Sequence, residues 1–504
     1  MPFQSSCARF GFGGGNVRIT SLSLAKSGSF DTYIAKYNTS GDLQWAARIG
    51  GTGDDQSYSI STDTSGNVYV TGYYASNPVT IFNANGTSFG TLASVSSSID
   101  VFIVKYNTSG VVQWTARIAD IGDDRGYGIS TDGSNNVYVT GFYTSNPVTI
   151  FNANGTSFGT LANAGLTDAF IVKYNTSGVV QWTARIGGTG DDPGYAITSD
   201  TSGNVYVTGY YASNPVTIFN ANGTSFGTLA NAGSADTFIV RYNTSGVVQW
   251  TARIAGTGAE TGWGITTDTS GNVYLTGQYS TNPVTIFNAN GTSFGTLANA
   301  GTSDACIVKY NTSGVVQWTA RITGSNSDIG FDIASDSSGN VYVAGRYLST
   351  PITIFNANGT SFGTLANAGS VGTADVFLVK YNTSGVVQWT ARIGGTSDER
   401  PYGIGVDSSG NVYVFGNYES TTLTIFNANG TTFGTLTTPL NRRAFTVKYN
   451  TSGTAQWAAR IGNTNAGGTA GSDNSQGGAC DAAGNAYITG PYASNPLMLY
   501  SQGI

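Results

Sequence analysis

Short runs of alternating hydrophobic and polar residues recur along the chain, and turn-forming residues separate them. Residues 194–200 and 205–211 are two such runs joined by Thr-Ser-Gly-Asn, and 236–242 and 247–254 are two more joined by Asn-Thr-Ser-Gly. Alternation with a period of two is typical of strands with one buried face, and Gly and Asn adopt the positive φ of tight hairpins. The pattern predicts a unit of four antiparallel strands.

A further hairpin interrupts this unit between its second and third strands. Residues 214–229 read Asn-Pro-Val-Thr-Ile-Phe-Asn-Ala-Asn-Gly-Thr-Ser-Phe-Gly-Thr-Leu. An Asn-Gly pair between two apolar runs is a strong hairpin signal. Because the unit is antiparallel, we expect the insertion and the loops between units on one face, opposite the Asn-Thr-Ser-Gly turns.

The unit is repeated along almost the whole chain. A Trp in the frame Gln-Trp-(Thr/Ala)-Ala-Arg-Ile marks each copy, with spacings of 69, 68, 68, 68, 71 and 68 residues. The Trp residues, which we interpret as buried structural anchors, are Trp45, Trp114, Trp182, Trp250, Trp318, Trp389 and Trp457. A fixed period of this size indicates a propeller or solenoid, and four strands fit a propeller blade. We expect an all-β, seven-bladed β-propeller with four-stranded blades and one inserted hairpin per unit.

The order of the half-units predicts how the ring closes. The chain starts with third and fourth strands near residue 31 and ends with first and second strands near residue 475. Pairing the N-terminal outer strands with the C-terminal inner strands would complete the last blade and cover its edges. We therefore predict one propeller over 31–504, and a cap or partial blade over 1–30, where residues 15–20 echo the second-strand text.

The repeated text carries a family resemblance. Residues 63–72 read Asp-Thr-Ser-Gly-Asn-Val-Tyr-Val-Thr-Gly, and residues 268–277 differ from them by one Leu for Val. Phe-Ile-Val-Lys-Tyr-Asn, or a close variant of it, follows in each copy. This text resembles the seven-bladed β-propeller repeats of bacteria and large DNA viruses. The resemblance implies a large ring scaffold, found in exported bacterial proteins and in large DNA viruses, and it implies no common chemistry.

Composition removes several function classes. His is absent, which excludes His-based triads and most zinc sites. The net charge is -6 and the basic residues are spread along the repeats, so nucleic-acid binding is disfavoured. No stretch approaches the roughly 20 apolar residues of a membrane span, and the N-terminal residues lack the apolar run of a classical signal peptide. We predict no catalytic residue, no enzymatic activity and no cofactor, apart from a weaker alternative of bound calcium.

Paired acids in the loops between units are one candidate binding set. They are Asp54 and Asp55, Asp123 and Asp124, Asp191 and Asp192, and Asp398 and Glu399. Hard cations prefer carboxylate oxygens, so a ring of calcium or sugar contacts is one interpretation. The alternative is that these are turn carboxylates that accept backbone N–H bonds.

Aromatic residues supply a second set. Each inserted hairpin carries two Phe residues, which either pack among themselves or form an apolar crown that marks an interface. The pairs that we assign to this set are Phe82 and Phe89, Phe151 and Phe158, and Phe219 and Phe226. Trp263 occupies a slot held elsewhere by Tyr58, Tyr127, Tyr195, Phe331 or Tyr402, and we interpret it as a packing variant.

Glycosylation acceptor patterns also recur, in Asn-Thr-Ser and in Asn-Gly-Thr. Sugars on the first set would coat the turns, although the same text is also good turn sequence. The first set comprises Asn38, Asn107, Asn175, Asn243, Asn311, Asn382 and Asn450.

These features favour a non-enzymatic structural or interaction scaffold. We expect a component of a virus particle or surface assembly, located on the virion or an extracellular surface, that binds protein partners through loops and hairpins of one face. The alternative is a multivalent, lectin-like propeller that binds glycans and gains affinity by avidity.

Overall fold

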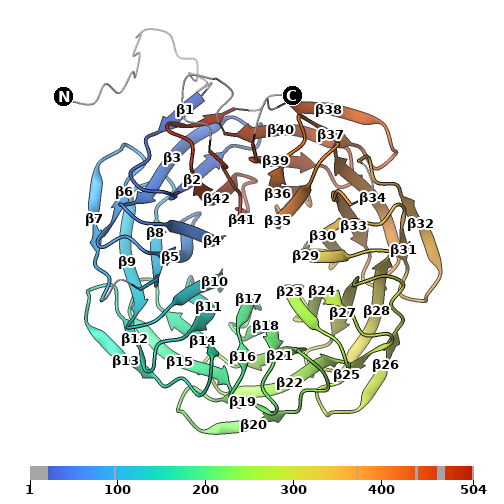
Figure 1. Ribbon diagram of the computed structural model, residues 1–504, viewed down its shortest axis with the longest axis horizontal. Coiled ribbons are helices and arrows are strands. Elements are labelled where there is room, and N and C mark those ends of the chain that lie inside the picture. Colours follow the sequence, from blue (N-terminus) through green and yellow to red (C-terminus); the bar gives the residue numbers. More distant parts are fainter. Residues whose placement is uncertain (1–20, 96–97, 370–371, 438–440, 463–470, 502–504) are drawn as a thin grey trace.

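The computed structural model describes residues 21–95, 98–369, 372–437, 441–462 and 471–501. In this part of the chain the strands form seven sheets, which stand around a central channel (Figure 1). Each sheet runs outward from the channel through six strands on its main path.

The strands of one sheet are described here from the channel to the rim. The innermost strands are β4 (Asp55–Thr62), β10 (Asp124–Thr131), β17 (Gly194–Ser199), β23 (Glu260–Thr267), β29 (Asp328–Ser335), β35 (Glu399–Val406) and β41 (Gly477–Cys480). The second strands are β5 (Val68–Tyr74), β11 (Val137–Tyr143), β18 (Val205–Tyr211), β24 (Val273–Tyr279), β30 (Val341–Tyr347), β36 (Val412–Tyr418) and β42 (Ala486–Tyr492).

The next two positions hold the most buried strands. The third strands are β2 (Asp31–Tyr37), β8 (Asp100–Tyr106), β14 (Thr167–Tyr174), β21 (Asp236–Tyr242), β27 (Asp304–Tyr310), β33 (Asp375–Tyr381) and β39 (Arg443–Tyr449). The fourth strands, which carry the repeated Trp, are β3 (Leu43–Gly50), β9 (Val112–Ala119), β15 (Val180–Gly187), β22 (Val248–Ala255), β28 (Val316–Thr323), β34 (Val387–Gly394) and β40 (Ala455–Ile461).

Two antiparallel strands form the rim of every sheet, and in six of the seven described sheets they are a hairpin. The first rim strands are β6 (Val79–Phe82), β12 (Val148–Phe151), β19 (Val216–Phe219), β25 (Val284–Phe287), β31 (Ile352–Phe355), β37 (Thr422–Phe426) and β43 (Leu497–Tyr500). The second rim strands are β7 (Ser88–Leu92), β13 (Ser157–Leu161), β20 (Ser225–Leu229), β26 (Ser293–Leu297), β32 (Ser361–Leu365), β38 (Thr432–Thr437) and β1 (Ser21–Leu24). The short β16 (Asp191–Asp192) pairs in parallel with β14.

The predicted fold class is wrong in the make-up of its blades. Four strands per blade were expected, but the inserted hairpin of one unit joins the outer edge of the preceding sheet, so that β6 pairs with β3 through Ile49↔Ile81 and Gly50↔Thr80. The sheet therefore has six strands. The physical reason is that the fourth strand would otherwise leave its backbone groups unpaired at the rim, and the hairpin covers that edge.

The chain ends meet as the order of the half-units predicted. Strand β42 pairs with β2 from Asp31↔Tyr492 to Tyr37↔Ala486, which completes one sheet from both ends of the chain. A second closure lies at the rim, where β1 pairs with β43 and β43 pairs with β40. Of the segment predicted as a cap or partial blade, residues 1–20 lie outside the described residues, so that division stays a prediction.

The hydrophobic core lies between neighbouring sheets. In one cluster, Tyr206, Ile239 and Trp250 of one sheet pack against Val273 and Leu275 of the next sheet. The other clusters repeat this arrangement around the ring. Each sheet is thus buried on both faces, and its second and third strands are almost entirely buried.

Candidate functional site

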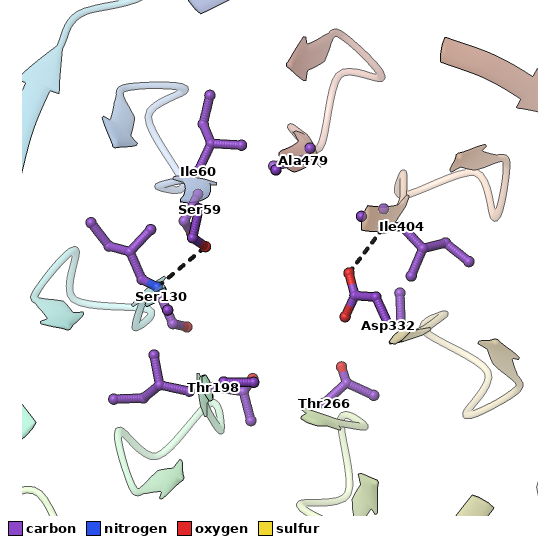
Figure 2. Close-up of a pocket in the computed structure, with 18 of the residues that line it drawn as sticks. Ser59, Ile60, Ser130, Thr198, Thr266, Asp332, Ile404 and Ala479 are labelled. Atoms are coloured by element: carbon purple, nitrogen blue, oxygen red, sulfur yellow. Dashed lines mark hydrogen bonds between the residues drawn. The ribbon is translucent and has the colours of Figure 1, made fainter. Parts of the chain in front are cut away.

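The innermost strands line a central cavity of about 760 Å³. Several hydrogen bonds cross its wall between neighbouring sheets, and Figure 2 shows two of them. The backbone N–H of Ile129 donates to Ser59 Oγ over 3.3 Å, and that of Ile404 donates to Asp332 Oδ2 over 2.9 Å. Asp332 is therefore a strut between sheets, and burial raises its pKa to about 7.

A girdle of aromatic side chains surrounds one end of this cavity, which we call the channel mouth. Adjacent ring centroids lie 4.9, 5.3, 4.6, 5.9 and 5.8 Å apart, and each ring is partly exposed. The girdle consists of Tyr58, Tyr127, Tyr195, Trp263, Phe331 and Tyr402. Gln476 lines the cavity in the seventh sheet, where the girdle is open. All seven residues stand one position before the position of Ser59 and Asp332. The six aromatic residues lie in the first half of the innermost strand, and Gln476 directly precedes β41.

Trp263 was interpreted from the sequence as a packing variant, but its ring belongs to this girdle. It stacks on Tyr195 with an interplanar angle of 10° and a centroid distance of 4.6 Å. Its Nε1 is buried and has no hydrogen-bond partner among the described residues. A buried N–H without a partner calls for an explanation, and a ligand or an ordered water would satisfy it.

The blades differ from one another at the channel mouth more than they do in their turns and buried strands. Behind the girdle, paired positions on the first and second strands hold Gln56 and Tyr73 in one sheet, and Ile329 and Arg346 in another. The turns and the buried strands keep nearly the same text in every copy. The mouth is therefore an asymmetric part of a repetitive molecule.

Three guanidinium groups lie at these variable positions. The Arg125 guanidinium carbon lies 4.8 Å from the centroid of the Tyr73 ring, and that of Arg346 lies 6.0 Å from the centroid of Phe331. Arg400 stands on the next sheet and makes an ion pair of 3.7 Å with Asp398. The Nε atoms of all three are buried without a hydrogen-bond partner among the described residues.

The predicted acid pairs divide into a buried member and a partly exposed member. The second acids, Asp55, Asp124, Asp192 and Glu399, are fully buried. Asp55 Oδ2 accepts hydrogen bonds from Ser76 Oγ at 2.6 Å and from Gly51 N at 2.8 Å, and Asp124 accepts one from Ser145 Oγ at 2.7 Å. These carboxylates tie the loop between sheets to the loop after the second strand.

The first acids of the pairs stand closer to solvent, and three of them act on groups at the mouth. The charge of Asp54 raises the pKa of Tyr73, after the larger effect of burial, and Asp191 has the same effect on Tyr210. Asp398 lies beside Arg346 and Arg400. Asp123 is exposed. The predicted binding role of these pairs stays a prediction, with one carboxylate of each pair available for it.

A second ring of buried acids lies next to the second acids. Six third strands carry a fully buried Asp: Asp31, Asp100, Asp168, Asp236, Asp304 and Asp375. The N–H of Gly395 lies within hydrogen-bond distance of both Asp375 Oδ1, at 3.3 Å, and Glu399 Oε2, at 3.0 Å. Burial raises the pKa of Asp375 to about 6 and that of Glu399 to about 8, and repulsion from the charge of Asp375 contributes to the rise at Glu399.

The remaining sheet replaces this acid by a base. Arg443 occupies the third-strand position, opposite Tyr418, where Asp375 lies opposite Tyr347. Arg443 and Asp473 are both buried, with 3.4 Å between Nη1 and Oδ2. One junction between neighbouring sheets thus holds a buried ion pair where the other six described junctions hold two acids.

The Phe residues of the hairpins lie on the rim, and the structure separates the two members of each pair. Phe82, Phe151 and Phe219 are partly buried beneath an Arg of the adjoining fourth strand, at 4.2, 4.4 and 4.0 Å from guanidinium carbon to ring centroid. Phe89, Phe158 and Phe226 are 44 to 45% exposed. The hairpins extend the sheets outward, so their place is the rim of the ring (Figure 1).

The seven Trp residues of the repeated frame join neighbouring sheets. Each is at most 9% exposed, and each donates its Nε1–H to a Thr carbonyl in the Asn-Thr-Ser-Gly turn of the next sheet. Trp250 Nε1, for example, lies 3.1 Å from Thr312 O, and Trp457 closes the series at 3.0 Å from Thr39 O. We call these contacts the Trp latches.

The Asn residues of the Asn-Thr-Ser patterns begin the turns that receive the Trp latches. Asn107 Oδ1 accepts hydrogen bonds of 3.0 Å from the N–H groups of Ser109 and Val111, and the other copies repeat this geometry. The side-chain carbonyl is thus used by the turn, while glycosylation at Nδ2 stays a prediction.

One signal for the mouth is visible in the sequence. The slot of Trp263 was seen to vary between aromatic residues, and a variable aromatic in an otherwise uniform repeat marks a position that the fold does not dictate. Arg125, Arg346, Arg400 and Gln476 were missed. They became recognisable only when the ring placed them around one opening.

Among the described residues, no group of three or more His, Cys, Asp or Glu residues could hold a metal ion. The alternative of bound calcium stays a prediction. No helix in the described part of the chain is long and apolar enough to cross a membrane.

Comparison with known proteins identifies the repeated unit. A family model described as "Beta-propeller repeat" matches residues 44–73, 181–210, 249–278, 317–346 and 388–417. Each match runs from a fourth strand to the second strand of the following unit. Five copies of the unit thus match the repeat of this β-propeller family. The resemblance drawn from residues 63–72 and their copies is confirmed.

Two curated relatives extend the comparison. The chain is 28% identical over 485 residues to an uncharacterized WD repeat-containing protein of Acanthamoeba polyphaga mimivirus, which covers 84% of this chain and 34% of the relative. It is 27% identical over 154 residues to the regulatory protein FlaEY of Caulobacter vibrioides, covering 31% of this chain and 15% of that protein. The chain thus spans about a third or less of the length of these relatives.

Among solved structures, Sqt1 from Chaetomium thermophilum aligns with 96% of this chain and 100% of that chain, at 9% identity and a TM-score of 0.31. A likeness at this score carries no conclusion about this protein.

Proposed function

We propose that this protein is a non-enzymatic binding scaffold that holds a partner over the channel mouth. The observation that carries the proposal is the asymmetry of the mouth within a ring of near copies. A scaffold needs the same latches in every blade, whereas one bound partner needs different groups from different blades. Aromatic and Arg side chains are also those enriched at protein interfaces.

Two features support the non-enzymatic part. The chain has no His, the commonest general base. The second acids of the loop pairs are bound by hydroxyl groups or backbone amides, as Asp55 is by Ser76 and Gly51. These carboxylates hold loops together and are not exposed to a substrate.

A pair of matched variants tests the proposal. Trp263→Ala removes a mouth side chain, and Phe226→Ala removes an exposed rim side chain. Tagged wild-type protein would be used to capture partners from its source material. We expect Trp263→Ala to lose a captured partner that Phe226→Ala retains, and the reverse result would move the interface to the rim.

Glycan binding is the second candidate, and the aromatic girdle is the observation that favours it. Sugar rings present C–H faces that pack on aromatic side chains, and the cavity is of the size of small-molecule sites, roughly 300–1,000 Å³. A glycan array on which no ligand binds, or binds equally to Trp263→Ala, would remove this candidate.

We further propose a virus particle or surface assembly as the setting. The similarity to the mimivirus protein and the repeated Asn acceptor patterns favour it. Mass spectrometry of purified particles or surface fractions is the test. Recovery of the protein only from the soluble interior of its cells would contradict this setting.

A further inference from the structure

Arg346 and Arg400 bring two guanidinium groups together at one sector of the channel mouth. Arg346 lies on β30 and Arg400 on β35, the innermost strand of the adjacent sheet. Burial lowers the pKa of Arg346, and the nearby charge of Arg400 lowers it further. Two like charges in a partly buried place repel each other unless a counter-charge lies between them.

The protein supplies only part of that counter-charge. Asp398 is 3.7 Å from Arg400, and its charge also reaches Arg346. The sector therefore keeps a net positive charge from two bases and one acid. The Nε atoms of both Arg residues are buried and lack a hydrogen-bond partner among the described residues, while both side chains remain partly exposed to an anion at the mouth. Arg groups with free donors bind carboxylates in a fork geometry.

The surroundings favour a sugar as the carrier of that anion. Phe331 and Tyr402, with ring centroids 5.8 Å apart, border the sector, and Trp263 adds a buried N–H without a partner. Further in, the cavity is lined by Ser130, Thr198 and other hydroxyl side chains (Figure 2). Hydroxyl groups can donate and accept, and this matches the hydroxyls of a saccharide.

We propose that the Arg346–Arg400 sector binds the carboxylate of an acidic sugar, whose ring packs against the aromatic girdle. This inference rests on glycan binding, the second candidate function, and it names the class of ligand. Arg125 offers a matched control within the same molecule. Arg125 is a single guanidinium at the position of β10 that Arg400 holds on β35. It packs on Tyr73, and the sheets of Tyr195 and Trp263 lie between it and the Arg346–Arg400 sector.

The experiment is calorimetric titration of the full chain with trigalacturonate, sialyllactose and uncharged maltotriose, and with a poly-glutamate peptide. We expect at least one acidic sugar to bind more tightly than maltotriose. Arg346→Gln and Arg400→Gln should each weaken it about tenfold or more, since a hydrogen bond to a charged group contributes about 1.5–3 kcal/mol. Arg125→Gln should change the affinity by less than about threefold.

Three results would overturn the inference: no binding of either acidic sugar, equal losses in all three variants, or binding of the peptide alone. The last result would assign the sector to an acidic protein segment. Circular dichroism of each variant shows whether it is folded, and Arg400→Lys, which keeps the charge without the fork, should restore only part of the affinity. If no sugar binds while Trp263→Ala still loses a captured protein, the scaffold function stands and only the ligand class fails.

Discussion

The Trp latches and the channel mouth are built from the same repeat, yet the latches are the same in every sheet and the residues at the mouth differ from sheet to sheet. Trp250 and Trp263 are only one strand apart in the chain. Trp250 is 7% exposed and repeats a hydrogen bond found in every sheet, whereas Trp263 is partly exposed and has no counterpart of the same type in the girdle. The residues that are the same in every sheet thus hold the ring together, and the residues that vary between sheets lie where we propose that a ligand binds.

The largest expected effect concerns this pair of Trp residues. Trp250→Ala should lower the free energy of unfolding by about 3–5 kcal/mol, because it empties a packed interface between sheets and removes the bond to Thr312 O. Trp263→Ala should cost about 1 kcal/mol or less, because its ring is partly exposed. Denaturant unfolding of both variants measures the difference. Similar losses would mean that the mouth is as structural as the latches.

The buried acids allow a prediction about pH. Burial raises the pKa of Asp100 and Asp328 to about 7 and that of Asp304 to about 6, against an ordinary value of 3.8. The folded protein therefore holds protons that the unfolded chain releases, so the free energy of unfolding should fall as the pH rises from about 4 to about 8. Denaturant midpoints at pH 5 and pH 8 measure this, and the midpoint should be higher at pH 5.

A single substitution sharpens this prediction. Asp328→Asn removes the titrating group while keeping a polar side chain beside Ser349. The free energy of unfolding should then vary less with pH, by on the order of 1 kcal/mol for each unit by which burial had raised the pKa of Asp328. A midpoint that rises with pH in the wild-type protein would contradict the assignment of these acids.

The smallest expected effect lies in a belt of hydroxyl groups along the innermost strands. Thr267 Oγ1 donates to Ser199 O at 3.0 Å, and Ser335 Oγ donates to Thr267 O at 2.8 Å, whereas Val406 has no hydroxyl at the next position. Thr267→Val should cost about 1 kcal/mol and Val406→Thr should recover a few tenths. Melting temperatures of the two variants give the signs, and equal signs would show that the belt does not contribute.

The repeat made much of the fold predictable, because strands, turns and closure depend on local text. Val205 to Tyr211 alternates visibly, and the turn at Thr201 to Asn204 is set by its own residues. The docking of β6 on β3 was not predictable, since only two residue pairs define it and they come from different units. The burial of Asp55 depends on Ser76, 21 residues away, which the loop geometry brings to it. Likewise, whether Tyr58 faces a channel depends on the width of the ring.

Hydrogen exchange of the complex with a captured partner, or with a bound acidic sugar, shows directly whether the ligand lies at the channel mouth. We expect added protection in the first half of the innermost strands, around residues 56–60, 261–265 and 400–404. The rim hairpins, such as 79–92 and 216–229, should be unchanged. Protection confined to those hairpins, with none around the channel mouth, would contradict binding at the mouth.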